Sequence, residues 1–239
     1  MTKVTPYKST ESKKKQVTKM FDNIAGSYDF LNHTLSLGMD NVWRKTAIKK
    51  LCINTSKILD IATGTADFAI SAAKYTNANI TGIDISQGML DVGVEKISKK
   101  GLTDRIQLQL ADSENLPFQE NSYDGITAGF GVRNFENLNK GLSEMHRTLK
   151  PGGVVAILEP SEPTYFPLKQ LYKLYFHHIL PYIGGIISKD KNAYNYLPDS
   201  VSAFPSGNDF LIELDKAGFK ESKLIPLTFG IVSLYVATK

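Results

Sequence analysis

Three aspartates each close an apolar run that is typical of a buried strand. Asp60 ends "KILD", Asp84 lies in "ANITGIDIS" and Asp112 ends "IQLQLAD". Gly64 stands in the turn after the first run, 20 residues before Asp84. An acidic residue at about this distance from a glycine turn meets ribose hydroxyls in dinucleotide-binding folds. One aspartate at a strand end is commonly a turn or cap residue, so it is the three together that predict a nucleoside site.

The turn itself, "DIATGTAD", indicates what else the nucleoside carries. A pyrophosphate-binding loop uses three glycines, whereas Ala62 and Ala66 stand on either side of Gly64 here. Asp60 adds a negative charge beside the loop, which repels a phosphate and attracts an ammonium group. S-adenosylmethionine, a nucleoside with an amino-acid tail, fits this pattern, and Ser113 is placed to meet its adenine edge. A nicotinamide-dependent oxidoreductase is the main competitor because it shares the acid spacing, but it needs the missing glycines.

The elements that must position these residues alternate along the chain. From residue 57, short apolar runs alternate with helical segments, which predicts βαβ units and an α/β fold with a mostly parallel sheet. The last run, "KLIPLTFGIVSLYVATK", divides around Gly230 and predicts an antiparallel hairpin that completes the sheet. We interpret "KPGG", residues 150–153, as a structural turn between a helix and a strand. Ligands of such sheets bind at the carboxyl ends of the strands, where the three aspartates stand.

Two segments interrupt the alternation. Residues 11–50 predict two helices, and we assign residues 1–50 to a helical arm that caps the substrate. Residues 51–239 are predicted to form the cofactor-binding domain, with a helical insertion at about 164–200. The insertion carries an apolar stripe at helical spacing: Leu168, Leu171, Tyr172, Tyr175, Ile179 and Tyr182. Such a stripe is usually core, and a lid over an apolar substrate is the alternative.

Composition bounds the class of protein. The chain has 239 residues, 42% of them hydrophobic, a net charge of +4 and a single cysteine, Cys52. One cysteine excludes a disulfide framework, and the four histidines show no ligand spacing, so no metal site is predicted. No basic run is interleaved with aromatic residues, so no nucleic-acid partner is predicted. Without a secretory signal or an apolar run of about 18 residues, the sequence favours the cytoplasm.

Longer stretches resemble a known family. The three aspartates, Gly64 and "LKPGG" are ordered as in class I S-adenosylmethionine-dependent methyltransferases. "YDFLNHTLSLGMDNVW" (28–43) and "RTLKPGGVVAILEPS" (147–161) resemble the two signature segments of the menaquinone/ubiquinone C-methyltransferases. "GFGVRNF" (129–135) and "YNYLPDSVSAFPSG" (194–207) are similar to that family too, and the likeness runs from about residue 14 to 239. The chain departs from the family pattern at Leu31, Asp40, Thr148 and Pro160.

The resemblance implies a Rossmann-like class I methyltransferase fold with a seven-stranded sheet. The cofactor contacts that it implies are Thr65, Asp84, Asp112 and Ser113, beside Asp60 and Gly64 of the loop. The implied substrate is a prenylated quinol methylated on a ring carbon: demethylmenaquinol, or a polyprenyl methoxybenzoquinol of ubiquinone biosynthesis. We prefer the naphthoquinol because that activity is the broader bacterial one in the family. The other readings are a same-fold enzyme acting on a sterol or phospholipid headgroup and an inactive cofactor-binding partner.

The resemblance also implies that Arg133, Asn134 and Tyr28 act in catalysis. An aromatic carbon is a poor nucleophile until a neighbouring phenol loses its proton. Arginine stays protonated in proteins, so we expect Arg133 to stabilise the phenolate, lowering the quinol pKa by about 1–3 units, rather than to act as a base. Asn134 and Tyr28 would hold a water that accepts the proton. The structural alternative is that Arg133 pairs with a carboxylate and Asn134 caps the next helix.

A prenyl tail requires that the enzyme collect its substrate at a membrane. We expect a peripheral contact at the inner face of the membrane, made by the aromatic segment 164–187 and by the lysine-rich first 19 residues. A solvated arm is the alternative reading of those lysines. The sequence does not predict an oligomeric state.

Overall fold

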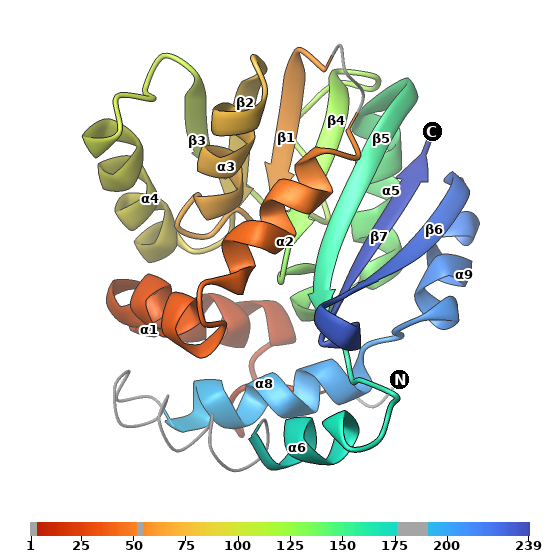
Figure 1. The fold of residues 1–239 in the computed structure, drawn as a ribbon. Helices are drawn as coiled ribbons and strands as arrows, with labels where there is room; N and C mark the ends of the chain where they lie inside the picture. Colours follow the sequence, from red (N-terminus) through yellow and green to blue (C-terminus); the bar gives the residue numbers. More distant parts are fainter. Residues whose placement is uncertain (1–3, 52–54, 176–190) are drawn as a thin grey trace.

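The computed structural model describes residues 4–51, 55–175 and 191–239. Cys52, two of the four histidines (His177 and His178), and Ile179 and Tyr182 of the apolar stripe lie outside the described residues. The described chain consists of a central sheet with helices on both faces and a helical layer at one end of the strands (Figure 1).

Seven strands form one sheet in the order β3-β2-β1-β4-β5-β7-β6. Their bounds are β1 Lys57–Ile61, β2 Asn79–Asp84, β3 Ile106–Leu110, β4 Tyr123–Gly129, β5 Leu149–Pro160, β6 Lys220–Leu227 and β7 Val232–Thr238. The first five strands pair in parallel, whereas β7 is antiparallel to both β5 and β6. The α/β class, the seven-stranded sheet and the C-terminal hairpin are therefore confirmed. The strand order reverses between β1 and β4, where ligands of such sheets bind.

Eight α-helices and two 3₁₀ turns lie in the described residues. They are α1 Lys13–Leu35, α2 Met39–Ile48, α3 Asp67–Tyr75, α4 Gln87–Lys99, η1 Val132–Asn134, α5 Leu138–Thr148, α6 Leu168–Leu174, α8 Lys191–Ala203, α9 Asn208–Lys216 and η3 Thr228–Gly230. Within the described ranges, no helix is long and apolar enough to cross a membrane.

The predicted turn at residues 150–153 is part of β5. Tyr123 pairs with Leu149 but Gly125 pairs with Val154, so the intervening residues of β5 bulge out of the pairing with β4. Gly152 in this bulge has a φ of 76°, a left-handed conformation that glycine adopts without strain. The glycines therefore redirect the chain as expected, but within a strand instead of before it.

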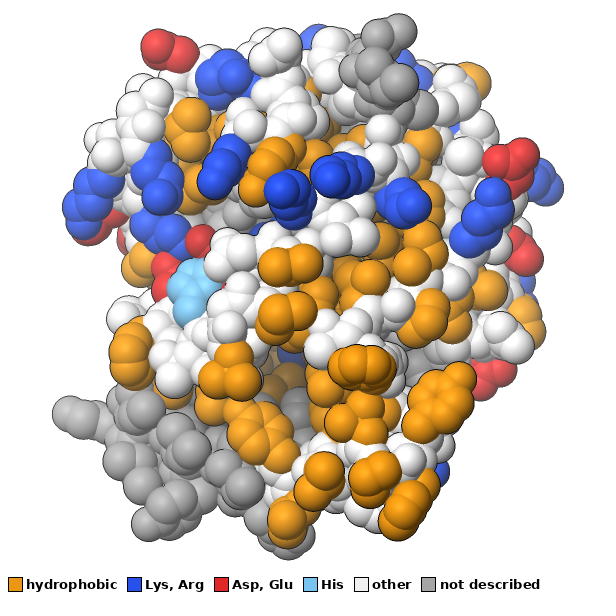
Figure 2. All heavy atoms as spheres, in the orientation of Figure 1, with side chains coloured by type: hydrophobic (Ala, Val, Ile, Leu, Met, Phe, Trp, Pro, Cys, Tyr) orange, Lys and Arg blue, Asp and Glu red, His pale blue; other side chains and the backbone are white. Residues whose placement is uncertain are grey.

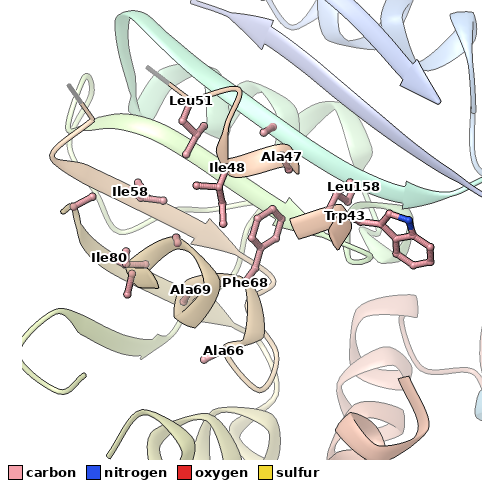
Figure 3. Close-up of a cluster of buried hydrophobic side chains, with 14 of the residues drawn as sticks. Trp43, Ala47, Ile48, Leu51, Ile58, Ala66, Phe68, Ala69, Ile80 and Leu158 are labelled. Carbon is pink, nitrogen blue, oxygen red and sulfur yellow. The ribbon is translucent and has the colours of Figure 1, made fainter. Parts of the chain in front are cut away.

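Each face of the sheet has its own apolar core. On one face α2 and α3 pack through residues such as Trp43, Ala47 and Phe68 (Figure 3). On the other face α5 and α9 pack through Leu142 and Phe210, among others. The alternation of strands and helices therefore leaves only the ends of the strands open for a site.

A third apolar cluster lies below the carboxyl ends of the parallel strands in Figure 1. It joins Met20 and Ile24 of α1 to Tyr172 of α6 and Tyr196 of α8. The first 50 residues thus serve two places, because α1 joins this cap while α2 packs on the sheet. The boundary at residue 50 stays a prediction.

Candidate active site

The loop after β1 opens a cavity at the carboxyl ends of the strands. Ala62, Gly64 and Ala66 all have left-handed backbones, with φ values of 52°, 54° and 67°. The Gly64 amide donates a hydrogen bond of 2.8 Å to Asp84 Oδ2, which ties the loop to the end of β2. A Cβ added to Gly64 would meet no heavy atom within 4 Å. The loop therefore presents bare backbone to open space, as a bound nucleoside requires.

This cavity, of about 60 Å³, gathers four of the six predicted cofactor residues: Gly64, Asp84, Asp112 and Ser113. Asp84 also accepts from the Ser86 amide at 2.9 Å, and burial raises the pKa of its carboxyl although the amides oppose that rise. Carboxylates at this end of the sheet suit ribose hydroxyls and an adenine amino group. These hydrogen-bond acceptors fit the adenosine part of S-adenosylmethionine.

Asp60 and Thr65 do not line this cavity in the described structure. The Asp60 side chain is fully buried and accepts hydrogen bonds from the hydroxyls of Thr63, at 2.5 Å, and Thr127, at 2.6 Å. Thr65 donates its hydroxyl to Asp29 of α1. A direct contact of Asp60 with the cofactor ammonium gains no support from this arrangement.

Helix α1 closes the cavity from the opposite side. Lys14 Nζ lies 2.7 Å from Asp112 Oδ2 and 3.0 Å from Glu114 Oε2. Asp22 accepts from the Ser86 hydroxyl at 2.6 Å, at the N-terminus of α4. These contacts hold α1 across the ends of β2 and β3, so α1 forms a wall of the cofactor cavity.

A second, larger cavity of about 470 Å³ adjoins the first. Most of its lining is apolar or aromatic, including Trp43, Tyr172 and Tyr175. Four residues line both cavities: Phe21, Tyr28, Phe130 and Asn134. The two cavities therefore meet at the predicted catalytic residues Tyr28 and Asn134.

The third predicted catalytic residue, Arg133, lines the larger cavity. Its Nη1 lies 2.9 Å from Glu159 Oε2 and also donates to the Phe130 carbonyl. The structural alternative holds for Arg133, which does pair with a carboxylate. It is wrong for Asn134, because the residue that caps α5 is Asn137.

Several buried polar atoms at the junction make no hydrogen bond within the described part of the chain. Among the described residues, neither Asn134 Oδ1 nor Asn134 Nδ2 has a hydrogen-bond partner, and the same is true of Arg133 Nε. Buried polar groups are nearly always satisfied, so atoms left open in a cavity indicate a ligand or a water. Burial raises the pKa of the Tyr28 phenol, which keeps it protonated at neutral pH.

A protein with a nucleoside cavity beside an apolar one can transfer a group between the two ligands. Residues 9–239 match the family model described as the ubiE/COQ5 methyltransferase family. The chain belongs to the ubiE/COQ5 methyltransferase family. Its predicted membership, its methyltransferase activity and its use of S-adenosylmethionine are confirmed at the level of the family.

Individual relatives of this ubiE/COQ5 protein agree. A "demethylmenaquinone methyltransferase" from Bacteroides fragilis is 47% identical, covering 99% of this chain and 98% of the relative. A "ubiquinone/menaquinone biosynthesis C-methyltransferase UbiE" from Geotalea daltonii is 45% identical, covering 98% of this chain and 100% of the relative. A solved SAM-dependent methyltransferase from Thermotoga maritima superposes with a TM-score of 0.65 at 19% identity, covering 92% and 99% of the two chains. The last likeness supports the fold alone.

Three site residues of this family member escaped the sequence analysis: Lys14, Glu159 and Tyr196. Glu159 is the penultimate residue of β5, beside β4, and an acid near a strand end was a signal that could have found it. Tyr196 comes from α8, and its hydroxyl is buried with no hydrogen-bond partner in the part of the chain that is described. Lys14 stood in a run of lysines that we interpreted only as a surface.

One cluster resembles a metal site by distance. The ligand atoms of His33, Asp40 and Asp67 lie within 4.8 Å of one another. Arg44 is already 2.6 Å from Asp40 and 3.5 Å from Asp67, and Lys96 is 2.5 Å from Asp67. Burial by itself would raise the pKa of the Asp40 carboxyl, but the Arg44 guanidinium and hydrogen bonding together outweigh burial, and the pKa is lowered. Because cations of the chain occupy these carboxylates, we interpret the cluster as an ion-pair network that joins α1, α2, α3 and α4.

Proposed function

We propose that this protein transfers a methyl group from S-adenosylmethionine to a ring carbon of demethylmenaquinol, forming menaquinol. The observation that carries the proposal is the junction of the two cavities at Phe21, Tyr28, Phe130 and Asn134. A cavity whose lining includes Asp84, Asp112 and Glu114 holds the donor, and an apolar cavity of about 470 Å³ holds the acceptor ring. The relatives that are named demethylmenaquinone methyltransferases support this choice of substrate.

The bound cofactor supplies a methyl group on a sulfonium, which is electrophilic without a metal. Asp84 and Asp112 bind the ribose and the adenine amino group, and α1 keeps water from the donor cavity. The acceptor carbon must carry enough negative charge to react, so the chain has to favour the phenolate of the quinol.

Arg133 and Tyr196 are placed to favour that phenolate. Both line the acceptor cavity, and the ion pair with Glu159 fixes the position of Arg133. Burial raises the pKa of Tyr196 to about 12, so its hydroxyl donates a hydrogen bond and does not accept the proton. Preorganised donors in a dry site stabilise developing negative charge strongly.

Asn134 and Tyr28 complete the site at the junction. The phenol must lose its proton before methyl transfer and the ring carbon must lose its proton after it, and neither side chain is a base at neutral pH. We propose that both side chains hold a water molecule that accepts the phenol proton and later the ring-carbon proton, each of which passes on to solvent; this water would satisfy the two open atoms of the Asn134 amide. Thr65 and Asp60 act behind the donor cavity in this proposal, Thr65 through its bond to α1.

Methylation of short-tailed quinol analogues with isotopically labelled cofactor tests the proposal. Transfer of label to the ring carbon of a naphthoquinol is expected, with slower transfer to a methoxybenzoquinol. The benzoquinol is the second candidate because the Geotalea daltonii relative is named for both pathways. Label on neither quinol, or label on a sterol or phospholipid headgroup instead, would contradict the proposal.

The prenyl tail of such a substrate sets where the enzyme works. We propose a cytoplasmic protein that makes a reversible contact with the inner face of the membrane. The larger cavity offers the ring a dry environment, whereas exposing the apolar prenyl tail to water is unfavourable. The acceptor must therefore be collected at the bilayer surface.

A further inference from the structure

We propose that the surface around the mouth of the larger cavity docks onto an anionic lipid bilayer. This mouth surface consists of six exposed hydrophobic residues: Leu37, Tyr165, Phe166, Leu171, Leu174 and Phe229. This proposal rests on the proposed function, because only a prenylated substrate gives the docking a purpose. The evidence for the surface itself is the exposure of its side chains, the backbone angles of two residues and the lysines on the same face. It keeps part of the aromatic segment that the sequence suggested, adds the turns at Leu37 and Phe229, and leaves out the lysine-rich arm.

The six side chains come from distant parts of the chain, and each of these segments also supplies a residue that lines the larger cavity. They belong to the turn between α1 and α2, to α6 and the segment before it, and to η3. Leu37 and Thr228, the neighbour of Phe229, also line the larger cavity. Figure 2 shows hydrophobic side chains gathered around a hollow in the lower half of this face. Exposed apolar side chains therefore lie in the same segments as lining residues of the acceptor cavity.

The exposure of these groups is large. Leu37 is 89% exposed, Phe166 82% and Phe229 79%. A monomeric surface rarely keeps a contiguous apolar patch unless that patch binds a partner or a membrane.

The backbone carries a second and independent signal. Leu37 and Phe229 have φ values of 52° and 57°, in the left-handed region that glycine and asparagine adopt far more readily. A turn that served only to reverse the chain would favour those residues at both places. Leucine and phenylalanine are costly there in backbone terms and gain nothing from packing, since both are exposed. Their side chains thus have a use outside the protein.

Charge on the same face of the molecule favours anionic lipid as the occupant. Lys and Arg side chains form a row over α2 and α3, above the hollow and separated from it by uncharged side chains (Figure 2). Lys45 and Lys74 both lie over the Tyr75 ring, 5.1 and 5.6 Å from its centre, and Lys49 and Lys50 are exposed after α2. Hydrophobic groups beside lysines match the interface of a bilayer, where acyl chains lie next to anionic headgroups.

The arm at the N-terminus has other tasks. Lys13 Nζ donates to the carbonyl oxygens of Arg133 and Phe135, and Lys14 pairs with Asp112 and Glu114. Two of its lysines are thereby engaged with the wall of the cofactor cavity. Docking through the mouth surface also lets the ring pass from the bilayer into the larger cavity while its tail stays in the lipid.

Vesicle flotation of the purified full-length protein, without quinol, tests the proposal. We expect flotation with vesicles of phosphatidylcholine and phosphatidylglycerol, less with phosphatidylcholine alone, and a loss of binding as salt is raised. Phe229→Asn removes an apolar group where asparagine suits the backbone, so its melting temperature should be unchanged or higher. Its vesicle partitioning should fall at least about fivefold, as should that of Lys45→Gln/Lys49→Gln.

Matched controls change similar residues elsewhere. Ile212→Ser removes a half-exposed apolar side chain from α9, and Lys15→Gln/Lys19→Gln removes two exposed lysines from α1. Both controls should float like the unchanged protein. Equal flotation of Phe229→Asn and the unchanged protein, or loss of binding only in the α1 lysine variant, would overturn the proposal. So would a stable dimer in solution that Phe229→Asn dissociates, because the patch would then bind a second copy.

The two proposals can fail separately. Flotation requires no turnover, and methylation of short-tailed analogues requires no membrane. Docking without quinol methylation would refute the proposed substrate alone, and methylation without docking would refute the membrane surface alone.

Discussion

Arg133 Nη1 lies 2.9 Å from Glu159 Oε2, and both side chains are buried. The pair joins η1 to the end of β5, and the Arg133 amide adds a bond of 3.2 Å to Glu159 Oε1. Burial raises the pKa of Glu159, although Arg133 opposes that rise. A guanidinium with such a partner is held in one orientation, and much of its charge is balanced. In the proposed mechanism, Arg133 therefore acts on the quinol through its hydrogen-bond donors more than as a free cation.

Arg133→Lys tests this role. Lysine keeps the charge, but its single ammonium group cannot bond to Glu159 and the Phe130 carbonyl and also reach a ligand in the cavity, as the forked guanidinium can. We expect kcat to fall about 100-fold, because misplaced groups cost that much, while cofactor affinity stays the same. Steady-state kinetics and calorimetry measure the two. Arg147→Lys is the control, since Arg147 makes a similar forked pair with Glu144 away from the cavities. Unchanged turnover in Arg133→Lys would end the proposal.

Tyr196→Phe removes a hydroxyl that is buried and unpartnered among the described residues. If this hydroxyl binds a quinol oxygen, the loss of one hydrogen bond should lower kcat/KM about tenfold. Stability should be unchanged or higher, because a buried hydroxyl without a partner is costly. The control is Tyr235→Phe, since the Tyr235 oxygen accepts from the Gly207 amide at 2.8 Å. That variant should lose about 1 kcal/mol of stability and keep its activity. Full activity in Tyr196→Phe would remove Tyr196 from the site.

Asp60→Asn should change how stability depends on pH. Burial raises the pKa of Asp60 to about 6, although the hydroxyls of Thr127 and Thr63 oppose the rise. The unfolded value is near 3.9, so between about pH 4 and 6 the folded state binds more protons than the unfolded chain. Stability therefore falls as pH rises through this window, by about 3 kcal/mol, and stays lower above it. Asp60→Asn should abolish this slope, which urea unfolding at pH 4 and at pH 7.5 would measure.

The same variant decides what Asp60 does for the cofactor. Unchanged cofactor affinity in Asp60→Asn assigns the residue to the interior, whereas a large loss supports the ammonium contact that the loop suggested. Asp124→Asn is the control for the direction in which stability changes with pH. Burial by itself would raise the pKa of Asp124, but hydrogen bonds from Lys150 and Ser56 outweigh burial and lower it. The stability that the ionised Asp124 contributes is therefore lost as pH falls. A wild-type stability that is flat between pH 4 and 6 would contradict the buried, protonated Asp60.

The cofactor cavity was the most predictable part of the site. Gly64, Asp84, Asp112 and Ser113 follow strands that the apolar runs reveal, and parallel strands bring their carboxyl ends to one edge. The direction of a side chain at that edge was not predictable. Asp60 turns toward Thr127 of β4, a partner 67 residues away that no local pattern announces.

The acceptor cavity depended on contacts between distant segments. Tyr28 comes from α1, Arg133 from η1 and Tyr196 from α8, and the resemblance suggested only the first two. The apolar stripe of residues 168–182 divides in the structure: Tyr172 and Tyr175 line the cavity, while Leu171 is exposed. Helical spacing identifies a stripe but not which neighbour covers it.

By itself the sequence determined the class of fold, the order of its elements and the edge where the cofactor binds. Those features follow from periodicity and from strand ends, which are local properties of the chain. Tertiary structure alone decided that Glu159 holds Arg133, that Lys14 closes on Asp112, and that Leu37 and Thr228 line the same cavity. Each of these depends on which segments pack together in space, and packing between distant segments leaves no period or spacing in the sequence.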